Sequence, residues 1–242
     1  MRAPAPIAVL VGLALLAGAV AYGLKTVGDG IGARDTRDTV TVTGSAKQRI
    51  SSDFVIWDAA VSAQSRQPAT AAAELGRWTQ AVRTFLTSSG VEPAELSVSP
   101  ISTERVAEVD ETGTQRFAAY NLTRTFQVRS ARVDAIVQMV QASTRLVSQG
   151  VPLTASPPQF IYTKLADLRP TLSAAATKDA INRAQTVVTQ AGARLGKLRA
   201  ISVGPFQLTP PGSTEASDYG TYDTTTRVKD VTSVVNVTFA LR

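Results

Sequence analysis

Apolar residues recur at intervals of three and four in three stretches of the chain, which predicts three long helices. The first is expected at residues 68–89, with four apolar residues on its inner face: Leu75, Trp78, Val82 and Phe85. Pro68 suits the first turn of this helix, and Gly90 suits the position after its end. We expect the apolar face to lie against a sheet.

The second and third helices are expected at residues 131–149 and 171–196. The inner face of the second carries Val133, Ile136, Val140 and Val147. The inner face of the third carries Ile181, Ala184, Val188, Ala191 and Leu195. Gly150 and Gly196 follow the last apolar positions, where glycine most easily forms a left-handed C-terminal cap.

Seven stretches show the alternation or the β-branched content that is typical of strands. They lie at residues 39–44, 53–63, 96–109, 117–129, 159–165, 197–204 and 231–241. One face of the second carries Val55, Trp57, Ala59, Val61 and Ala63. One face of the last carries Val231, Ser233, Val235, Val237, Phe239 and Leu241. Pro100 predicts a bulge or a sheet edge within the third.

Residues 1–25 are predicted to be a membrane anchor or a signal segment. Residues 7–24 carry no charge over 18 positions, near the minimum for a helix that spans a bilayer and longer than the apolar core of most secretory signals. An uncleaved N-terminal hydrophobic helix is one interpretation. Cleavage after Ala21, within the small-x-small pattern Ala19-Val20-Ala21, is the other. Both interpretations place the rest of the chain outside the cytoplasm, and residues 26–38 would form a flexible linker.

The composition narrows the chemistry that this chain can perform. It has no cysteine and no histidine, so thiol chemistry and the commonest metal ligand are absent. The net charge is +6, but no two lysine or arginine residues are adjacent, whereas nucleic-acid sites cluster them. We therefore expect no nucleic-acid partner; the excess charge indicates a soluble basic surface, or one that faces an anionic membrane.

No catalytic motif is present in the sequence. There is no glycine-rich phosphate loop, no G-x-S-x-G sequence and no metal-ligand cluster. Serine and lysine lie close together at Ser45 and Lys47 and at Ser173 and Lys178, but neither pair has the S-x-x-K spacing of a helical turn. We expect no enzyme activity and assign no catalytic, cofactor-binding or metal-binding residue.

A few polar residues have more than one interpretation. Arg124 falls on the apolar face of its predicted strand. It could be a buried anion-binding group; the favoured interpretation is an arginine that reaches solvent at a sheet edge or pairs with a carboxylate. Asn121 and Asn236 begin N-x-[ST] sequences, but both lie in predicted strands, so glycosylation is not expected.

Two groups of carboxylates lie in predicted turns and loops. Three of them gather at a hairpin tip, where solvent should keep their pKa values ordinary: Glu108, Asp110 and Glu111. Residues 209–226 form a polar segment with five residues that could bind a cation or a partner: Glu215, Asp218, Tyr219, Tyr222 and Asp223. Their spacing fits no calcium-binding loop, so a solvated surface loop is the favoured interpretation.

Three stretches resemble the SIMPL-domain family, which includes periplasmic and outer-membrane immunogenic proteins of Gram-negative bacteria. They are TVTVTGSA at residues 39–46, TKDAINRAQTVVTQAGARLGKLRAIS at 177–202 and VTSVVNVTFAL at 231–241. The resemblance implies one α+β domain over residues 39–242, with an antiparallel sheet, three long packed helices and export to the cell envelope. Some relatives form ring-like or channel-like oligomers, and others are linked to oxidative-stress tolerance. The apparent anchor and the 209–226 segment depart from the family.

These observations favour a non-enzymatic cell-envelope protein that self-assembles or binds an envelope partner. It would face the periplasm at the inner membrane, held through residues 7–24 as a single-pass anchor. The alternative is a monomeric periplasmic binding or stress-protection module that is soluble after signal cleavage. A hydrolase would need a Ser–Lys pair or carboxylates that converge in a pocket.

Overall fold

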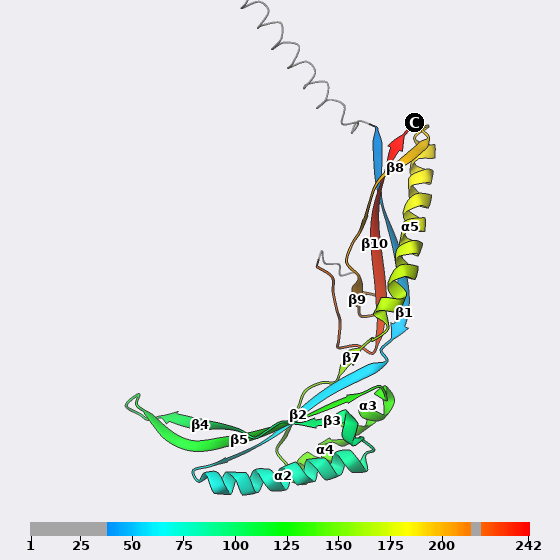
Figure 1. Ribbon diagram of the computed structural model, residues 1–242. Helices are drawn as coiled ribbons and strands as arrows, with labels where there is room; N and C mark the ends of the chain where they lie inside the picture. Colours follow the sequence, from blue (N-terminus) through cyan, green and yellow to red (C-terminus); the bar gives the residue numbers. More distant parts are fainter. Residues whose placement is uncertain (1–37, 214–218) are drawn as a thin grey trace, which may run out of the picture. The chain divides into compact units, whose positions relative to one another are not determined.

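The computed structural model describes residues 38–213 and 219–242 (Figure 1). These residues form two compact units. The first comprises the described residues up to Thr43 together with Ala180–Ser202 and Asn236–Arg242. The second comprises Gly44–Asp179 and Val203–Val235, apart from the residues that are not described.

Six strands of the second unit form one antiparallel sheet. Its order is β3 (Leu96–Val98), β5 (Gln115–Ser130), β2 (Phe54–Ser65) and β6 (Leu153–Ala155), with β4 (Ser102–Val109) on β5 and β7 (Gln159–Ile161) on β2. The central pair β2–β5 runs in continuous register from Val55 opposite Ser130 to Ser65 opposite Tyr120. The alternation predicted for residues 53–63 is confirmed, because all five apolar residues of that face are buried.

Helix α2 (Pro68–Ser88) packs on β2 and β5 through an apolar face. Its buried apolar residues are Ala71, Leu75, Val82 and Leu86, while Trp78 and Phe85 pack at the margin of the same core. Full burial of each large aliphatic side chain contributes about 1.5–3 kcal/mol. The helix begins and ends where the sequence predicted, and Gly90 has a φ of 85°.

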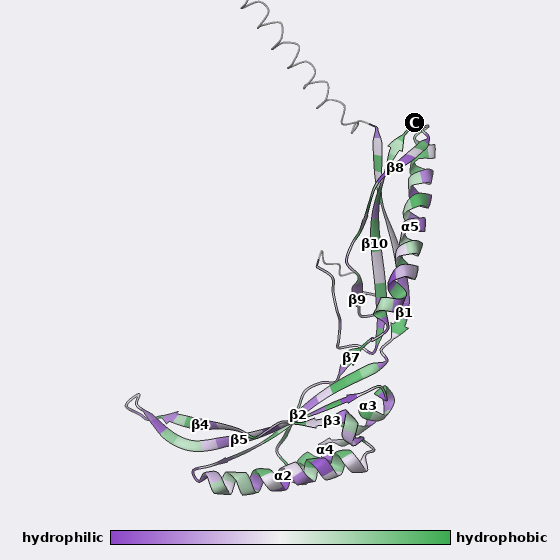
Figure 2. Cartoon of the chain, viewed as in Figure 1, coloured by the Kyte–Doolittle hydropathy of each residue, from purple (hydrophilic) through white to green (hydrophobic). Residues whose placement is uncertain are grey.

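A second antiparallel sheet has the order β1 (Thr39–Ser51), β10 (Val228–Leu241) and β8 (Leu195–Val203), and β9 (Gln207–Thr209) also pairs with β10. The predicted apolar face of β10 is confirmed, with Val231, Ser233, Val235, Val237 and Phe239 buried. Helix α5 (Leu165–Gln190) alternates between apolar and polar turns (Figure 2). Leu165 is buried at its start, and from Leu172 on the buried residues recur every four positions: Leu172, Ala176, Ala180, Ala184 and Val188.

The second predicted helix is divided at Ser143 into α3 (Val133–Ala142) and α4 (Thr144–Ser148). The Ser143 hydroxyl donates to the Val140 carbonyl over 2.7 Å, a local bond that competes with helix continuation. The break rotates the last turn. Leu146 is therefore buried at 3% exposure, and Val147, which was expected on the inner face, is 55% exposed.

The end of the third helix was also predicted wrongly. Helix α5 ends at Gln190, and Gly192, with a φ of 74°, occupies the left-handed position expected for Gly196. Gly196 lies in β8, where a Cβ atom would come within 2.7 Å of the Ala240 carbonyl oxygen. The glycine is thus required by the close approach of β10. Three positions of the predicted face are not buried: Ile181, Ala191 and Leu195.

The fold class is confirmed as α+β with antiparallel sheets and three helical regions, the second of them divided. Two sheets replace the single one expected, and the predicted strand at residues 96–109 is interrupted at Ser99, Pro100 and Ile101. The predicted hydrophobic helix at residues 7–24 lies outside the described residues. Within the described part of the chain, no helix is long and apolar enough to cross a membrane.

Candidate binding surfaces

In the part of the chain that the structure describes, neither serine–lysine pair has its serine hydrogen-bonded to its lysine. Lys47 Nζ lies 3.7 Å from Asp230 Oδ2, and the backbone N–H of Ser45 donates to Asp179 over 2.9 Å. The described residues also include no group of three or more acidic side chains placed to hold a metal ion. These positions therefore offer no assembled nucleophile or metal site.

Arg124 is half-buried on β5, opposite the fully buried Val61 of β2. Its Nε atom is buried and has no hydrogen-bond partner among the described residues. Because the side chain keeps part of its surface in water, it is not the fully buried arginine that the anion-site interpretation requires. Asn121 and Asn236 lie in β5 and β10, as expected.

Asp110 holds the turn between β4 and β5. It accepts hydrogen bonds from the Thr112 hydroxyl and from the backbone N–H groups of Thr112 and Thr114, and it forms an ion pair with Arg116 at 2.7 Å. The Thr112 hydroxyl makes the largest contribution to lowering the pKa of Asp110 below its usual value. The expectation of an ordinary pKa is therefore wrong for this residue, because hydrogen bonds within the turn stabilise the carboxylate.

The 209–226 segment is more structured than a solvated loop. Glu215 and Asp218 lie outside the described residues, whereas Tyr219 and Tyr222 are exposed and Tyr222 forms a bridge with Leu208 of β9. The Asp223 carboxylate is buried and accepts hydrogen bonds from Thr225 (2.7 Å from its hydroxyl) and Thr226. For Asp223, the interpretation as a solvated residue is therefore wrong.

Lys229 is the cation that pairs with Asp223. Its side chain is 1% exposed, that of Asp223 is 6% exposed, and Nζ lies 3.1 Å from Oδ2. Nζ also donates to the Thr226 carbonyl. Burial by itself raises the pKa of Asp223, but the hydrogen bonds from Thr225, Thr226 and Lys229 outweigh it and hold the pKa well below the usual range.

Three further carboxylates form ion pairs with arginines. Asp230 is buried and accepts a 2.9 Å hydrogen bond from Arg49 Nε, which is the main reason that its pKa is lowered. Glu95 binds Arg132, and this hydrogen bond lowers its pKa to about 2. Arg227 likewise contacts both oxygens of Asp134 in the first turn of α3. Sequence reasoning singled out none of these pairs. Only Glu95 had a signal in the sequence, because the spacing Glu92-x-x-Glu95 is that of a capping box at the start of a helix.

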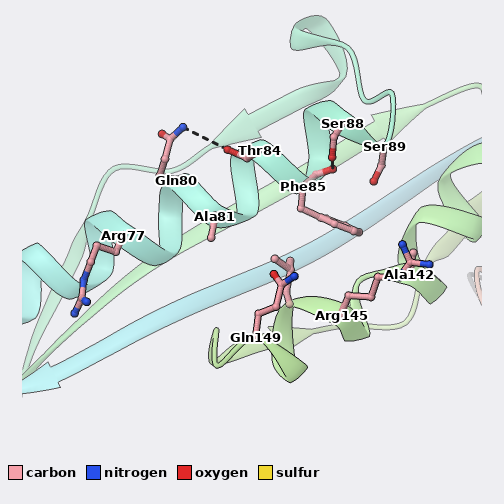
Figure 3. A pocket seen from close by; sticks show the side chains of 11 residues that line it. Arg77, Gln80, Ala81, Thr84, Phe85, Ser88, Ser89, Ala142, Arg145 and Gln149 are labelled. Atoms are coloured by element: carbon pink, nitrogen blue, oxygen red, sulfur yellow. Dashed lines mark hydrogen bonds between the residues drawn. The ribbon is translucent and has the colours of Figure 1, made fainter.

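A groove of about 730 Å³ lies between α2 and the α3–α4 region (Figure 3). Its floor is apolar, formed by Ala81, Phe85, Ala142 and Leu146. Its rim carries hydroxyl and amide groups and two arginines, Arg77 and Arg145. Figure 3 shows these arginines at opposite ends of the groove, so they do not converge on one anion. The groove is open and suits an apolar or weakly polar ligand.

Strand β8 is poorly covered and lies at one end of its sheet, with the longer strand β1 at the other end. Seven of its nine residues are exposed. They include three large apolar side chains, Leu198 at 54%, Ile201 at 51% and Val203 at 52%. Strand β4 is similar, with seven of its eight residues exposed. Exposed, apolar edge strands are templates for pairing with another chain, and natural proteins normally protect them.

Among the described residues, then, the structure offers binding surfaces and no assembled catalytic group. The family model described as "SIMPL: Protein of unknown function (DUF541)" matches residues 40–239. The chain belongs to the SIMPL family, whose function is unknown. The resemblance seen in the sequence is thus confirmed, whereas the assignment of residues 39–242 to one domain stays a prediction.

Comparisons with individual proteins add little. None of the curated proteins matches this chain. One solved structure that matches is the regulatory subunit of aspartate kinase from Thermus thermophilus in its ligand-free form. The two chains are 15% identical, the match covers 82% of this chain and 88% of the other, and the TM-score is 0.19. A superposition this poor supports no conclusion about fold or ligand.

Proposed function

We propose that this protein is a non-enzymatic module of the cell envelope that faces the periplasm and acts by self-association or by binding another envelope protein. Residues 7–24 would hold it at the periplasmic side of the inner membrane as a single-pass anchor. The alternative is a soluble periplasmic protein that has lost this segment by signal cleavage.

The exposed edge of β8 carries the proposal. A strand that pairs on one side only presents a row of backbone N–H and C=O groups to its surroundings. Here that row is flanked by three large apolar side chains that are each more than half exposed: Leu198, Ile201 and Val203. Apolar surface of this kind is stabilised when another chain covers it, and it favours a protein partner.

The electrostatics of the second unit support a structural rather than a catalytic role. The two carboxylates with the largest pKa shifts, Asp223 and Glu95, are each paired with a cation that holds them ionised. A general acid or base needs a pKa near the working pH and access to substrate. These carboxylates have neither property, since their pKa values are depressed and their oxygens are occupied by neighbours.

The decisive measurement is the mass of the full chain in a mild detergent, by light scattering with the detergent contribution subtracted. A discrete oligomer, or a defined complex with a co-expressed envelope protein, is the expected result. A monomer at the highest soluble concentration that also forms no such complex would contradict the proposal. The location is tested separately with Gln80→Cys, the only thiol in the chain, which should react in cells with a reagent that cannot cross the inner membrane.

The groove between α2 and the α3–α4 region favours the second candidate function, a monomeric binding or stress-protection module. It combines an apolar floor with a polar rim, as ligand sites do. A monomeric chain that binds a long-chain amphiphile, and loses that binding in Ala81→Trp, would favour this function. The matched control is Ala72→Trp, which lies on the exposed side of the same helix.

A further inference from the structure

Strands β4 and β8 are long, exposed edge strands, and β1 is a third, at the other end of the sheet that contains β8. β8 lies at one end of its sheet, and β4 pairs with β5. The register shift between Val106 and Ala107 skips Ala118 on β5, so β4 itself contains no extra residue. The free edge of β4 runs over eight residues, a length of about 27 Å, and can accept another strand.

The charges of the two strands are complementary. β8 carries Lys197 and Arg199 and no acidic residue, whereas β4 carries Glu104 and Glu108 with one arginine, Arg105. Pairing two β8 edges would bring the like charges of Lys197 and Arg199 together, which destabilises a strand pair. Pairing β4 with β8 brings opposite charges together. Arg199 already makes an interaction within its own chain, and a guanidinium has donors for a second carboxylate.

We propose that β4 of one copy pairs antiparallel with β8 of a second copy, with Glu108 opposite Arg199. This inference rests on the proposed self-association and names its interface. In this register the alternation of side chains also sets two apolar pairs opposite each other, one of which includes the half-buried Val106. The three facing pairs are Glu108–Arg199, Val106–Ile201 and Val109–Leu198. Slipping by one residue would replace these pairs with mismatched ones.

The contact is head-to-tail, because each copy offers a different strand at each of its two edges. A repeated head-to-tail contact closes into a ring when the rotation between copies allows it, and otherwise extends. No third surface is needed, since every copy has one β4 edge and one β8 edge. The proposal therefore accounts for the exposed edges of β4 and β8 within one chain.

The register is tested by crosslinking, which the absence of native cysteine makes unambiguous. Ala107 and Ala200 face each other in the proposed pairing, and both are small and exposed. We expect a mixture of Ala107→Cys and Ala200→Cys full-length chains to form a crosslinked dimer with a short thiol reagent. The control mixture of Ala107→Cys with Gln80→Cys, an exposed position on α2, should not crosslink.

The energetics are tested with Glu108→Lys, which should raise the dissociation constant of the oligomer about tenfold. The control is Glu74→Lys, the same charge reversal on α2, which should leave the dissociation constant unchanged. A monomeric wild-type chain overturns both the self-association and this interface. A wild-type oligomer that shows no 107–200 crosslink, or that tolerates Glu108→Lys as well as Glu74→Lys, overturns the interface alone.

Discussion

Replacing Lys229 with methionine should lower the free energy of unfolding by about 3–5 kcal/mol. The ammonium and the Asp223 carboxylate are 3.1 Å apart, and their side chains are 1% and 6% exposed. Methionine fills a similar volume but leaves the carboxylate buried without its cation. The largest part of the loss is therefore the desolvation of an unpaired charge rather than the net strength of the ion pair.

The matched control is Lys47→Met. Lys47 pairs with Asp230 at 3.7 Å, but its side chain is half exposed, so water replaces the lost partner. The change should lower the free energy of unfolding by less than about 1 kcal/mol. Both variants are measured by urea unfolding of the full chain in a mild detergent, followed by circular dichroism. A loss of less than about 1 kcal/mol in Lys229→Met would refute the reasoning.

The double variant Asp223→Asn with Lys229→Met measures how strongly the two side chains are coupled, apart from the effect of losing each one. Asparagine keeps an acceptor for the Thr225 and Thr226 donors but carries no charge. The double variant should therefore be more stable than Lys229→Met alone, and the two losses should not add. Strictly additive losses would show that Asp223 and Lys229 are not coupled.

The same pair predicts a dependence on acid. The pKa of Asp223 is lower in the folded protein than its unfolded value of about 3.9. The folded state therefore binds this proton less well, so the contribution of the pair is complete above about pH 4 and falls as pH drops toward the folded pKa. The urea midpoint of Asp223→Asn should decline less than that of the wild-type chain between about pH 4 and 2.

Two further predictions use neighbouring or matched residues. Gly196→Ala should destabilise the protein by about 1–3 kcal/mol, because the new Cβ atom meets the Ala240 carbonyl oxygen at 2.7 Å. Gly76→Ala, in open space inside α2, should stabilise it by up to about 1 kcal/mol, and equal effects in urea unfolding would contradict the reasoning. Leu146→Ala should be destabilising by about 2–5 kcal/mol and Val147→Ala by less than about 1 kcal/mol; the reverse order would support the continuous helix that the sequence predicted.

Periodicity along the chain predicted the elements whose burial depends on one continuous face. Within residues 53–63 and 231–241, every buried position falls on the predicted face, because a strand side chain can point only to one of two sides. Helix α2 was predicted for a similar reason, with Pro68 at its start and Gly90 after its end. The absence of catalytic motifs, cysteine and histidine was likewise readable without a structure.

The candidate surfaces were less visible in the sequence. The 197–204 strand was predicted, but nothing in its pattern showed that it would lie at a sheet edge with both faces exposed. A strand lies at an edge when no other strand pairs with one of its sides. Strand pairing joins residues that are distant along the chain, so the local pattern does not show it. The groove between α2 and the α3–α4 region lies beside the break at Ser143, which the apolar periodicity did not predict.

The sequence alone determined the SIMPL resemblance, the α+β class and the apolar faces, because these follow from neighbours a few positions apart. Only the tertiary structure decided which polar residues are buried. Asp230 meets Arg49, 181 positions away, and Gly196 is needed only because Ala240 passes beside it. The folded environment of a charge or a glycine depends on such distant contacts, which local periodicity does not encode.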